Sequence, residues 1–358
     1  MDHTAGSKPG RAPTLSDVAL IASVSHQTVS RVINNRAAVD ANTRSRVLQA
    51  IEAIGYQPNY VARSLTTKVT NTVAVLIPTV GNPYFADIVA GIESVAVARG
   101  VGLLLVHSAF DPEREMQHAY QMRRRRVDGL ILCHSRLESS QLQALSETTS
   151  VPMVLVHRTA TGHLVGSVGT DRVDGVRRSV AYLHGLGHNR IGLMSTSLSH
   201  EAKDDFLRGY KLGLQQVGLD FEPPLVVVAP STIGGGEATA GTLLDAGGLP
   251  TAIICQSDVM AMGTLRACSA RGLEVPRDMS VLGWGDIEFA TVTSPPLTTM
   301  HVPRFELGVA AAELWLEMID KEPANREVIL PLTLVQRDSC CQYQGRKHGP
   351  CQRPSAET

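Results

Sequence analysis

Residues 24–34 read VSHQTVSRVIN and decide the fold of the first part of this chain. Val29, Val32 and Ile33 recur at the spacing of one helix face, and Ser25 is placed to cap the first turn. The remaining positions carry Ser, His, Gln, Thr and Arg, with no Glu. The stretch therefore predicts a short helix that buries one side and presents hydrogen-bonding groups on the other.

The flanking residues complete a three-helix unit. Upstream, Ser16 is predicted to cap a helix. Downstream, a helix that starts near Asp40 ends at Gly55. The predicted inward residues of these two helices are Val18, Ala19, Ala22, Val47, Leu48, Ile51 and Ile54. Two short helices joined by a tight turn, with a third closing the core, are typical of the helix-turn-helix arrangement.

The exposed side of the middle helix suits double-stranded DNA. Gln pairs bidentately with adenine and Arg with guanine, and the start of a recognition helix faces base edges. His26, Gln27 and Arg31 are therefore the predicted base readers. Short polar side chains suit phosphate oxygens, and the predicted phosphate contacts are Ser25, Thr28, Ser30 and Asn34. The alternative is an ordinary three-helix bundle with a solvated polar side.

Composition and charge narrow the class of protein. The chain has 358 residues, of which 43% are hydrophobic and 19% charged, a globular mixture long enough for two or three domains. No run of about 18 apolar residues is present, and the polar start MDHTAGSKPGRAPT lacks the apolar region of a secretory signal. Residues 1–71 hold eight Lys/Arg against four Asp/Glu, although the net charge is −1. We expect a cytoplasmic protein whose small basic head binds a polyanion.

Residues 56–71, YQPNYVARSLTTKVTN, link this head to the rest. A helix starting near Asn59 places Ala62 and Leu65 on one side, but about two turns are only marginally stable in isolation. An exposed Leu on a basic helix can wedge between base steps in a minor groove. Two interpretations stay open: a hinge helix that orders on DNA, and a plain linker whose Leu packs on the body.

From Thr72 onward, apolar runs alternate with amphipathic stretches. The runs TVAVLIP, GLLLVH, GLILCH and PMVLVH are followed by a second set, RIGLMS, LVVVA, AIICQ and SVLGW. Such runs predict buried parallel strands. Two series of them predict an α/β body of two doubly wound parallel-sheet lobes, with a ligand cleft at the carboxyl ends of the strands. The loops at those ends are 78–85, 107–111, 133–136, 157–160, 195–206, 255–258 and 284–290.

Several motifs follow one another along the chain. The head holds SDVA, VSHQTVSRVIN, TRSRV, GYQPN and ARSL, and the body holds NPYFADIVAGIE (82–93), LGHNRIGLM (186–194), SDVMAMG (257–263) and VPRDMSVLGWGDI (275–287). Their order and spacing resemble the lactose-repressor/galactose-repressor family over about residues 14–337. The resemblance implies an N-terminal all-α helix-turn-helix head on a periplasmic-binding-protein-like body.

The resemblance also implies a function. The chain is expected to be a transcription regulator, usually a repressor, that binds a palindromic operator as a homodimer and is controlled by a small metabolite. Thr14 is expected to join the phosphate contacts. Leu65 is expected to wedge a CpG step at the operator centre, where the hinge helices enter the minor groove. The expected hinge contacts are Asn59, Ala62, Arg63 and Leu65.

The predicted domain boundaries follow from these segments. They are a disordered arm at 1–13, the helix-turn-helix domain at 14–57, the hinge at 58–71, the two-lobed effector-binding and dimerisation body at 72–337, and a disordered tail at 338–358. The tail cluster CCQYQGRKHGPC (340–351) lacks common zinc-knuckle spacing, so no metal is expected. No cofactor fingerprint or catalytic set stands out, so the chain is not expected to be an enzyme.

The expected effector pocket departs from the family pattern. Phe206 stands where the family usually has Arg. Ser257-Asp258 replaces Asn-Asp, and Gly285 replaces the first acid of G-[YF]-D-D. Several groups that normally bind sugar hydroxyls are thus missing. The candidate effector-binding residues are Tyr84, Phe85, His157, Arg158, Phe206, Ser257, Asp258, Trp284 and Asp286.

These departures leave three interpretations of the effector. A buried ligand group without a partner costs about 1–3 kcal/mol, so a neutral hexose should bind poorly. The favoured effector is a sugar acid, suggested by the GWGDIEFA variant (283–290); it could instead be apolar or phosphorylated, or the pocket could be silent. We therefore expect a repressor of a carbohydrate or sugar-acid utilisation operon. The alternatives are a two-lobed small-molecule receptor and an effector-independent regulator.

Overall fold

The computed structural model describes residues 12–33, 39–57, 69–149, 151–159, 164–196, 201–245, 250–320 and 326–344. The chain divides into two compact units, 1–70 and 71–358. This division lies one residue before the predicted junction between hinge and body. Within the described ranges, no helix is long and apolar enough to cross a membrane.

The head is built from short helices around a small core. Its described helices are α1 (Leu15–Ile21), α2 (His26–Ile33) and α3 (Ala41–Ile54). The predicted core is confirmed for Val18, Ala19, Ala22, Val29, Val32 and Val47, which are buried together with Ala50 and Tyr56. Leu48 was predicted to face inward but is 51% exposed, because Val47 and Ala50 occupy the inner side of α3.

Capping residues set the ends of these helices. The N-cap of α1 is Thr14 rather than the predicted Ser16, and the Asp17 carboxylate accepts hydrogen bonds from the Thr14 N–H and hydroxyl at 2.8 and 2.6 Å. Asp40 caps α3 through the Thr43 N–H at 3.0 Å. Gly55 ends α3 with φ +63°, a left-handed conformation that favours glycine. The last two were predicted.

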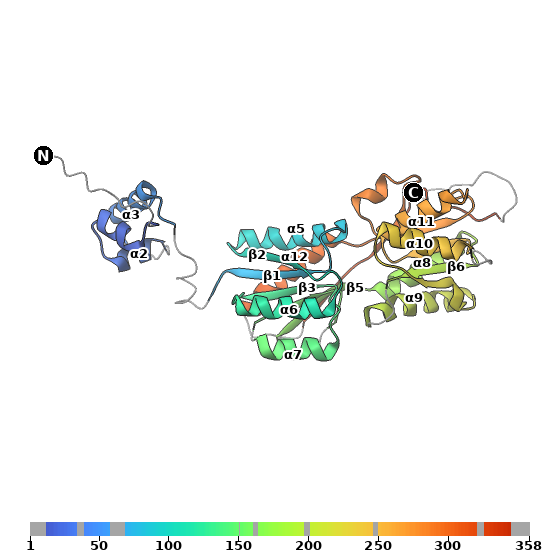
Figure 1. Cartoon of the computed structure of the whole chain (residues 1–358), viewed down its shortest axis with the longest axis horizontal. Helices are drawn as coiled ribbons and strands as arrows, with labels where there is room; N and C mark the ends of the chain where they lie inside the picture. Colours follow the sequence, from blue (N-terminus) through green and yellow to red (C-terminus); the bar gives the residue numbers. More distant parts are fainter. Residues whose placement is uncertain are drawn as a thin grey trace. The chain divides into compact units, whose positions relative to one another are not determined.

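The N-terminal lobe of the body is a sheet between two helical layers (Figure 1). Its strands lie in the order β11-β5-β4-β3-β1-β2 and are all parallel. The strands are β1 (Thr72–Ile77), β2 (Gly102–His107), β3 (Gly129–Cys133), β4 (Met153–Val156), β5 (Val165–Thr170) and β11 (Glu327–Leu330). The helices are α5 (Pro83–Ala98), α6 (Pro112–Arg124), α7 (Ser139–Thr149) and α12 (Arg304–Asp320).

The C-terminal lobe repeats this plan. Its strand order is β12-β10-β9-β8-β6-β7, and only the edge pair β10–β12 is antiparallel. The strands are β6 (Ile191–Ser195), β7 (Val226–Val228), β8 (Ala252–Cys255), β9 (Ser280–Gly285), β10 (Thr298–His301) and β12 (Thr333–Val335). The helices are α8 (Arg172–Gly185), α9 (Glu201–Val217), α10 (Ile233–Asp245) and α11 (Asp258–Ala270), with short 3-10 turns η1 (Pro223–Leu225) and η2 (Glu288–Thr291).

Residue alternation in the strands explains the layers. In β1, Val73, Val75 and Ile77 join the core under α5 and α12, while Ala74 and Leu76 join the core under α6. A strand covered on both faces must be apolar at every position, so the predicted apolar runs correspond to strands in both lobes. The exception is β2, which is partly exposed because it lies at a sheet edge.

The two lobes are joined where the chain passes between their sheets. Described crossings follow β5, β10 and β11, so both sheets end at the same junction. Arg304 at the start of α12 reinforces it: the guanidinium donates to the Asp87 carboxylate at 2.7 Å in its own lobe and to the Gly285 carbonyl in the other. The predicted architecture of two doubly wound lobes is therefore confirmed.

The prediction of a disordered tail from residue 338 is wrong for residues 338–344. Ser339, Cys340 and Cys341 are buried, and the Val281 N–H donates to the Ser339 carbonyl at 2.9 Å. The Ser339 side chain also bonds β9 and β10, accepting from the Thr298 N–H and donating to the Val281 carbonyl. This segment is held because it satisfies backbone groups of the sheet. The rest of the predicted tail lies outside the described residues.

Candidate DNA-reading helix and ligand cleft

The exposed side of α2 carries the three predicted base readers. His26, Gln27 and Arg31 are exposed, whereas Val29 and Val32 on the same helix are buried. Gln27 and Arg31 lie one helical turn apart and therefore share a face. The first turn contains no acid, and the N–H groups of a helix N-terminus favour a negative charge. The solvent-exposed side of α2 thus carries groups that can bind DNA.

The predicted phosphate contacts in the head are placed by local hydrogen bonds. The Thr28 N–H donates to Ser25 Oγ at 3.1 Å, and the two hydroxyl oxygens are 2.9 Å apart, which confirms Ser25 as the cap of α2. Ser25 is exposed, and Thr14, Thr28 and Ser30 are half-buried. These hydroxyls flank the exposed side of α2 at or near its first turns.

Other predicted DNA contacts lie outside the described residues. They are Asn34 after α2 and the hinge residues Asn59, Ala62, Arg63 and Leu65.

A cleft between the two lobes opens at the carboxyl ends of their strands. The described lining residues are Asn82, Tyr84, Phe85, Phe110, His134, Ser135, Arg136 and His157 from the N-terminal lobe, and Arg172, Thr196, Phe206, Ser231, Gln256, Ser257 and Trp284 from the C-terminal lobe. Six of the nine candidate effector residues are among them. The structure therefore brings together Tyr84, Phe85, His157, Phe206, Ser257 and Trp284.

Tyr84 and two histidines form the centre of the N-terminal wall. The Tyr84 hydroxyl lies 2.7 Å from His157 Nε2, and the imidazole centroids of His134 and His157 are 4.6 Å apart. Burial lowers the pKa of His134 to about 3 and that of His157 well below its usual value, so both rings are neutral at pH 7. His134 Nε2 and His157 Nδ1 have no hydrogen-bond partner among the described residues.

The opposite wall is apolar. Phe206 from α9 and Trp284 from β9 meet edge to face, with ring centroids 4.6 Å apart, a favourable aromatic geometry. Both rings are almost fully buried. Phe206, which stands in the expected arginine position, therefore replaces a cation with a ring that packs on Trp284.

Two amides at the cleft have fixed orientations. Asn82 caps α5, so its oxygen accepts from the Tyr84 N–H at 3.0 Å. The Gln256 oxygen accepts from the Thr196 N–H at 2.6 Å and from the Ser195 hydroxyl at 2.7 Å. Because a backbone N–H can only donate, the oxygen of each amide is identified and its NH₂ group is the one left for other partners.

Two arginines border the cleft in different ways. Arg172 bridges the lobes: it donates to the His157 carbonyl at 2.9 Å and pairs with the Asp205 carboxylate at 2.7 Å. Arg136 is half-buried and lies over the Phe110 ring at 5.4 Å. Burial lowers the pKa of Arg136, and among the described residues no carboxylate lies within ion-pair distance of its guanidinium.

Three candidate effector residues do not line the cleft. The Arg158 guanidinium donates to the carbonyls of Ser135 and Leu137. Asp258 is buried and accepts from the Thr299 hydroxyl at 2.5 Å and the Ile287 N–H at 2.8 Å.

Asp286, the third, pairs with Arg337 at 2.6 Å and with His301 at 2.9 Å. All three side chains bond to protein groups in the structure, and their assignment as ligand contacts stays a prediction.

Nine lining residues were not predicted as effector contacts, but the loops that carry most of them were predicted. Asn82, Phe110, His134, Ser135, Arg136, Thr196 and Gln256 all lie on loops predicted at the carboxyl ends of strands. Arg172 was missed because β5, the strand before it, reads VGSVGT and lacks an apolar run. Ser231 follows β7 a few residues beyond the predicted loop.

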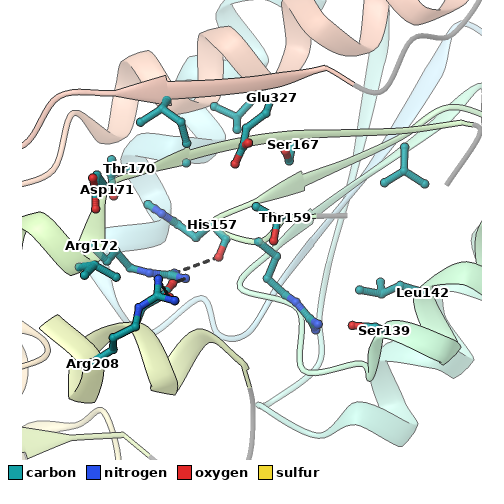
Figure 2. Close-up of a pocket in the computed structure, with 17 residues that line it drawn as sticks. Ser139, Leu142, His157, Thr159, Ser167, Thr170, Asp171, Arg172, Arg208 and Glu327 are labelled. Atoms are coloured by element: carbon teal, nitrogen blue, oxygen red, sulfur yellow. Dashed lines mark hydrogen bonds and ion pairs between the residues drawn. The ribbon is translucent and has the colours of Figure 1, made fainter. Parts of the chain in front are cut away.

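A second cavity lies beside the cleft and shares His157 and Arg172 with it (Figure 2). Its other charged lining residues are Arg158, Asp171, Asp205, Arg208 and Glu327. Acids and bases are balanced there, and Asp205 pairs with both Arg172 and Arg208. No group of three or more His, Cys, Asp or Glu able to hold a metal ion occurs within the described ranges.

Comparison with known proteins agrees with both the helical head and the two-lobed body. The pattern of "Bacterial regulatory proteins, lacI family" matches residues 14–59, and that of "Periplasmic binding protein-like domain" matches residues 180–340. The HTH-type transcriptional repressor PurR of Haemophilus influenzae is 33% identical over 86% of this chain and 91% of its own length. This chain belongs to the LacI family.

Other LacI-family relatives extend over nearly the whole chain. The ribose operon repressor of Haemophilus influenzae is 32% identical over 91% of this chain and 98% of its own. The Lac repressor dimer bound to operator and the anti-inducer ONPF superposes with a TM-score of 0.84 at 29% identity, covering 92% of this chain and 99% of that one. LacI-family proteins are transcriptional regulators, not enzymes, which confirms the predicted class.

Proposed function

We propose that this protein is a dimeric repressor that binds a palindromic operator and is switched by a small metabolite in the interlobe cleft. The observation that carries the proposal is the acid-free first turn of α2 with His26, Gln27 and Arg31 exposed on it, in a LacI-family chain. Operator binding would place its action in the cytoplasm.

Each predicted DNA contact has a proposed role. His26, Gln27 and Arg31 read base edges in the major groove of a half-site. Hydroxyl and amide groups hold phosphates; these are Thr14, Ser25, Thr28, Ser30 and Asn34. In the hinge, Leu65 wedges a central CpG step, and Asn59, Ala62 and Arg63 lie along the minor groove.

The switch rests on the junction between the lobes. Arg172 and Arg304 each bond both lobes, so a ligand that changes the angle of the cleft must reorganise these bonds. A ligand shifts an equilibrium only by binding one state better than the other. We propose that cleft closure around the metabolite is coupled to the spacing of the two hinges in the dimer.

The genes controlled are proposed to serve carbohydrate or sugar-acid utilisation. A relative named for the ribose operon supports a carbohydrate theme. In the cleft lining, Phe206 packs on Trp284 in place of the arginine that would donate to sugar hydroxyls, which argues against a neutral hexose; the GWGDIEFA variant (283–290) is the basis for proposing a sugar acid.

Capture of genomic DNA tests this function directly. Purified intact protein is mixed with sheared DNA from its source, and bound fragments are sequenced; the matched control is the double variant Gln27→Ala/Arg31→Ala. We expect fragments upstream of a few transcription units to be enriched by the wild type alone. Equal recovery by both proteins would contradict the assignment of α2 as the reading helix.

A further inference from the structure

The charged side chains at the cleft are hydrogen-bond donors, and the side-chain acceptors left among its described lining residues are hydroxyl oxygens and imidazole nitrogens. None of its described lining residues is Asp or Glu. The oxygens of Asn82 and Gln256 are already used by backbone N–H groups, so these side chains offer NH₂. Sugar hydroxyls must donate as well as accept, and each buried donor left unpaired costs about 1–3 kcal/mol. The side chains that line the cleft therefore favour a ligand rich in hydrogen-bond acceptors.

The cleft also holds a cation that forms no direct ion pair among the described residues, although the buried Glu115 carboxyl, which accepts from the Arg136 backbone N–H, attracts it electrostatically. Arg136 is half-buried and stacked on Phe110, with no ion pair among the described residues. Removing a guanidinium from water is unfavourable unless an anion compensates it. On Arg172, Nη1 and Nη2 are engaged while the buried Nε has no partner within the described part of the chain. Both groups fit the oxygens of a planar carboxylate.

Aromatic rings supply the remaining wall. The chain contains 7 Tyr, 6 Phe and 2 Trp, and five of these residues line the cleft: Tyr84, Phe85, Phe110, Phe206 and Trp284. The neutral imidazoles of His134 and His157 add two further flat surfaces. Such walls favour a flat ring over a flexible chain.

We propose that the effector is a small organic carboxylate borne on a flat ring, with its carboxylate paired to Arg136. The proposal rests on the proposed role of the cleft as the effector site and narrows the ligand to one chemical class. An aromatic acid has this chemistry in full; the ring form of a uronic acid shares the ring-borne carboxylate but is puckered and carries donating hydroxyls, so it is the competing source that the test must distinguish.

Calorimetric titration of the intact protein tests the class. The probes are benzoate, 4-hydroxybenzoate and 2-furoate for aromatic rings, glucuronate and galacturonate for sugar rings, and glucose and ribose as neutral sugars. Each carboxylate is compared with its own carboxamide. We expect at least one ring carboxylate to bind at least about tenfold more tightly than its carboxamide. Whether the tighter ligand is an aromatic acid or a uronic acid then identifies the source. Binding of neutral sugars alone, or no carboxylate better than its carboxamide, overturns the proposal.

Variants then test the assigned cation. Arg136→Gln should weaken the bound carboxylate at least about tenfold, Arg136→Lys should restore part of the loss, and the carboxamide should be unaffected by either. The matched control is Arg114→Gln, an exposed arginine of α6 in the same lobe, which should bind like the wild type. Equal affinity of Arg136→Gln and wild type overturns the pairing. Unchanged thermal unfolding of the variant shows that it is folded.

The two proposals fail in different ways. Ligand affinity is measured without DNA, and DNA capture is measured both with and without a metabolite extract. Carboxylate binding by a protein that captures no specific DNA would leave the ligand class standing and remove the repressor function. Specific DNA capture by a protein that binds no ring carboxylate would leave the repressor function standing and remove the ligand class.

Discussion

Arg31 lies exposed in the last turn of α2, one turn beyond Gln27. If it reads a guanine bidentately, Arg31→Ala should cost about 1–3 kcal/mol at one base pair and relax the preference there. The measurement is fluorescence anisotropy against the operator and its single-base substitutions at fixed salt. An even loss across all sequences would show that Arg31 holds phosphate.

Asp258 gives the folded state a pH dependence. Burial raises its pKa to about 6, against 3.8 for the ordinary carboxyl, despite hydrogen bonds from Thr299 and Ile287. The folded protein thus holds this proton more tightly than the unfolded chain. Its contribution to stability is full below about pH 4 and is lost as the pH rises through about 6, by about 3 kcal/mol.

The variant Asp258→Asn should flatten this dependence. Its unfolding free energy in denaturant should match the wild type at pH 4 and exceed it at pH 8, because the amide cannot ionise. The oxygen of Asn can still accept from Ile287. Parallel pH profiles of the two proteins would contradict the assignment of the titration to Asp258.

Residue-level prediction succeeded where a side chain's type limits its surroundings. Tyr84, Phe85 and Trp284 are large rings at strand ends, and they line the cleft as predicted. Asp258 and Asp286 also follow strands, but sequence position does not say which way a carboxylate points. Both turn toward buried donors of the C-terminal lobe.

At the scale of elements, apolar runs revealed most strands and missed those with small or polar residues. The strands β5, VGSVGT, and β10, TTMH, are buried, but their glycine, serine and threonine content hides them. Without these strands the crossings between the lobes could not be predicted, nor could the helix α12 that returns to the first lobe. Where the chain has passed from one lobe to the other, the sequence of the next helix or strand does not indicate which sheet it joins.

The close approach of α5 and α12 depends on glycine. A Cβ at Gly308 would lie 2.1 Å from the Ile88 carbonyl oxygen, so Gly308→Ala must push the helices apart. We expect a loss of about 1–3 kcal/mol in the free energy of unfolding. Gly234→Ala is the matched control, because a Cβ there meets nothing within 4 Å; it should be neutral or slightly stabilising. Equal stability of both variants would show that the contact relaxes freely.

For the whole molecule, a palindromic operator requires two heads and therefore a dimer surface on the body. Phe289 in η2 and Val292, three residues later at its C-cap, are 52% and 74% exposed, and a contiguous exposed apolar surface marks a candidate interface. The double variant Phe289→Glu/Val292→Glu should sediment as a monomer, while Leu212→Glu on α9 should remain a dimer. Dimeric behaviour of both variants would place the interface elsewhere.

The most direct test of the central claim is selection of bound duplexes from random DNA by the intact protein, with and without a metabolite extract. We expect an enriched inverted repeat with a central CpG step, bound by two copies, and a change in enrichment when extract is present. Absence of any enriched sequence in both conditions would contradict it.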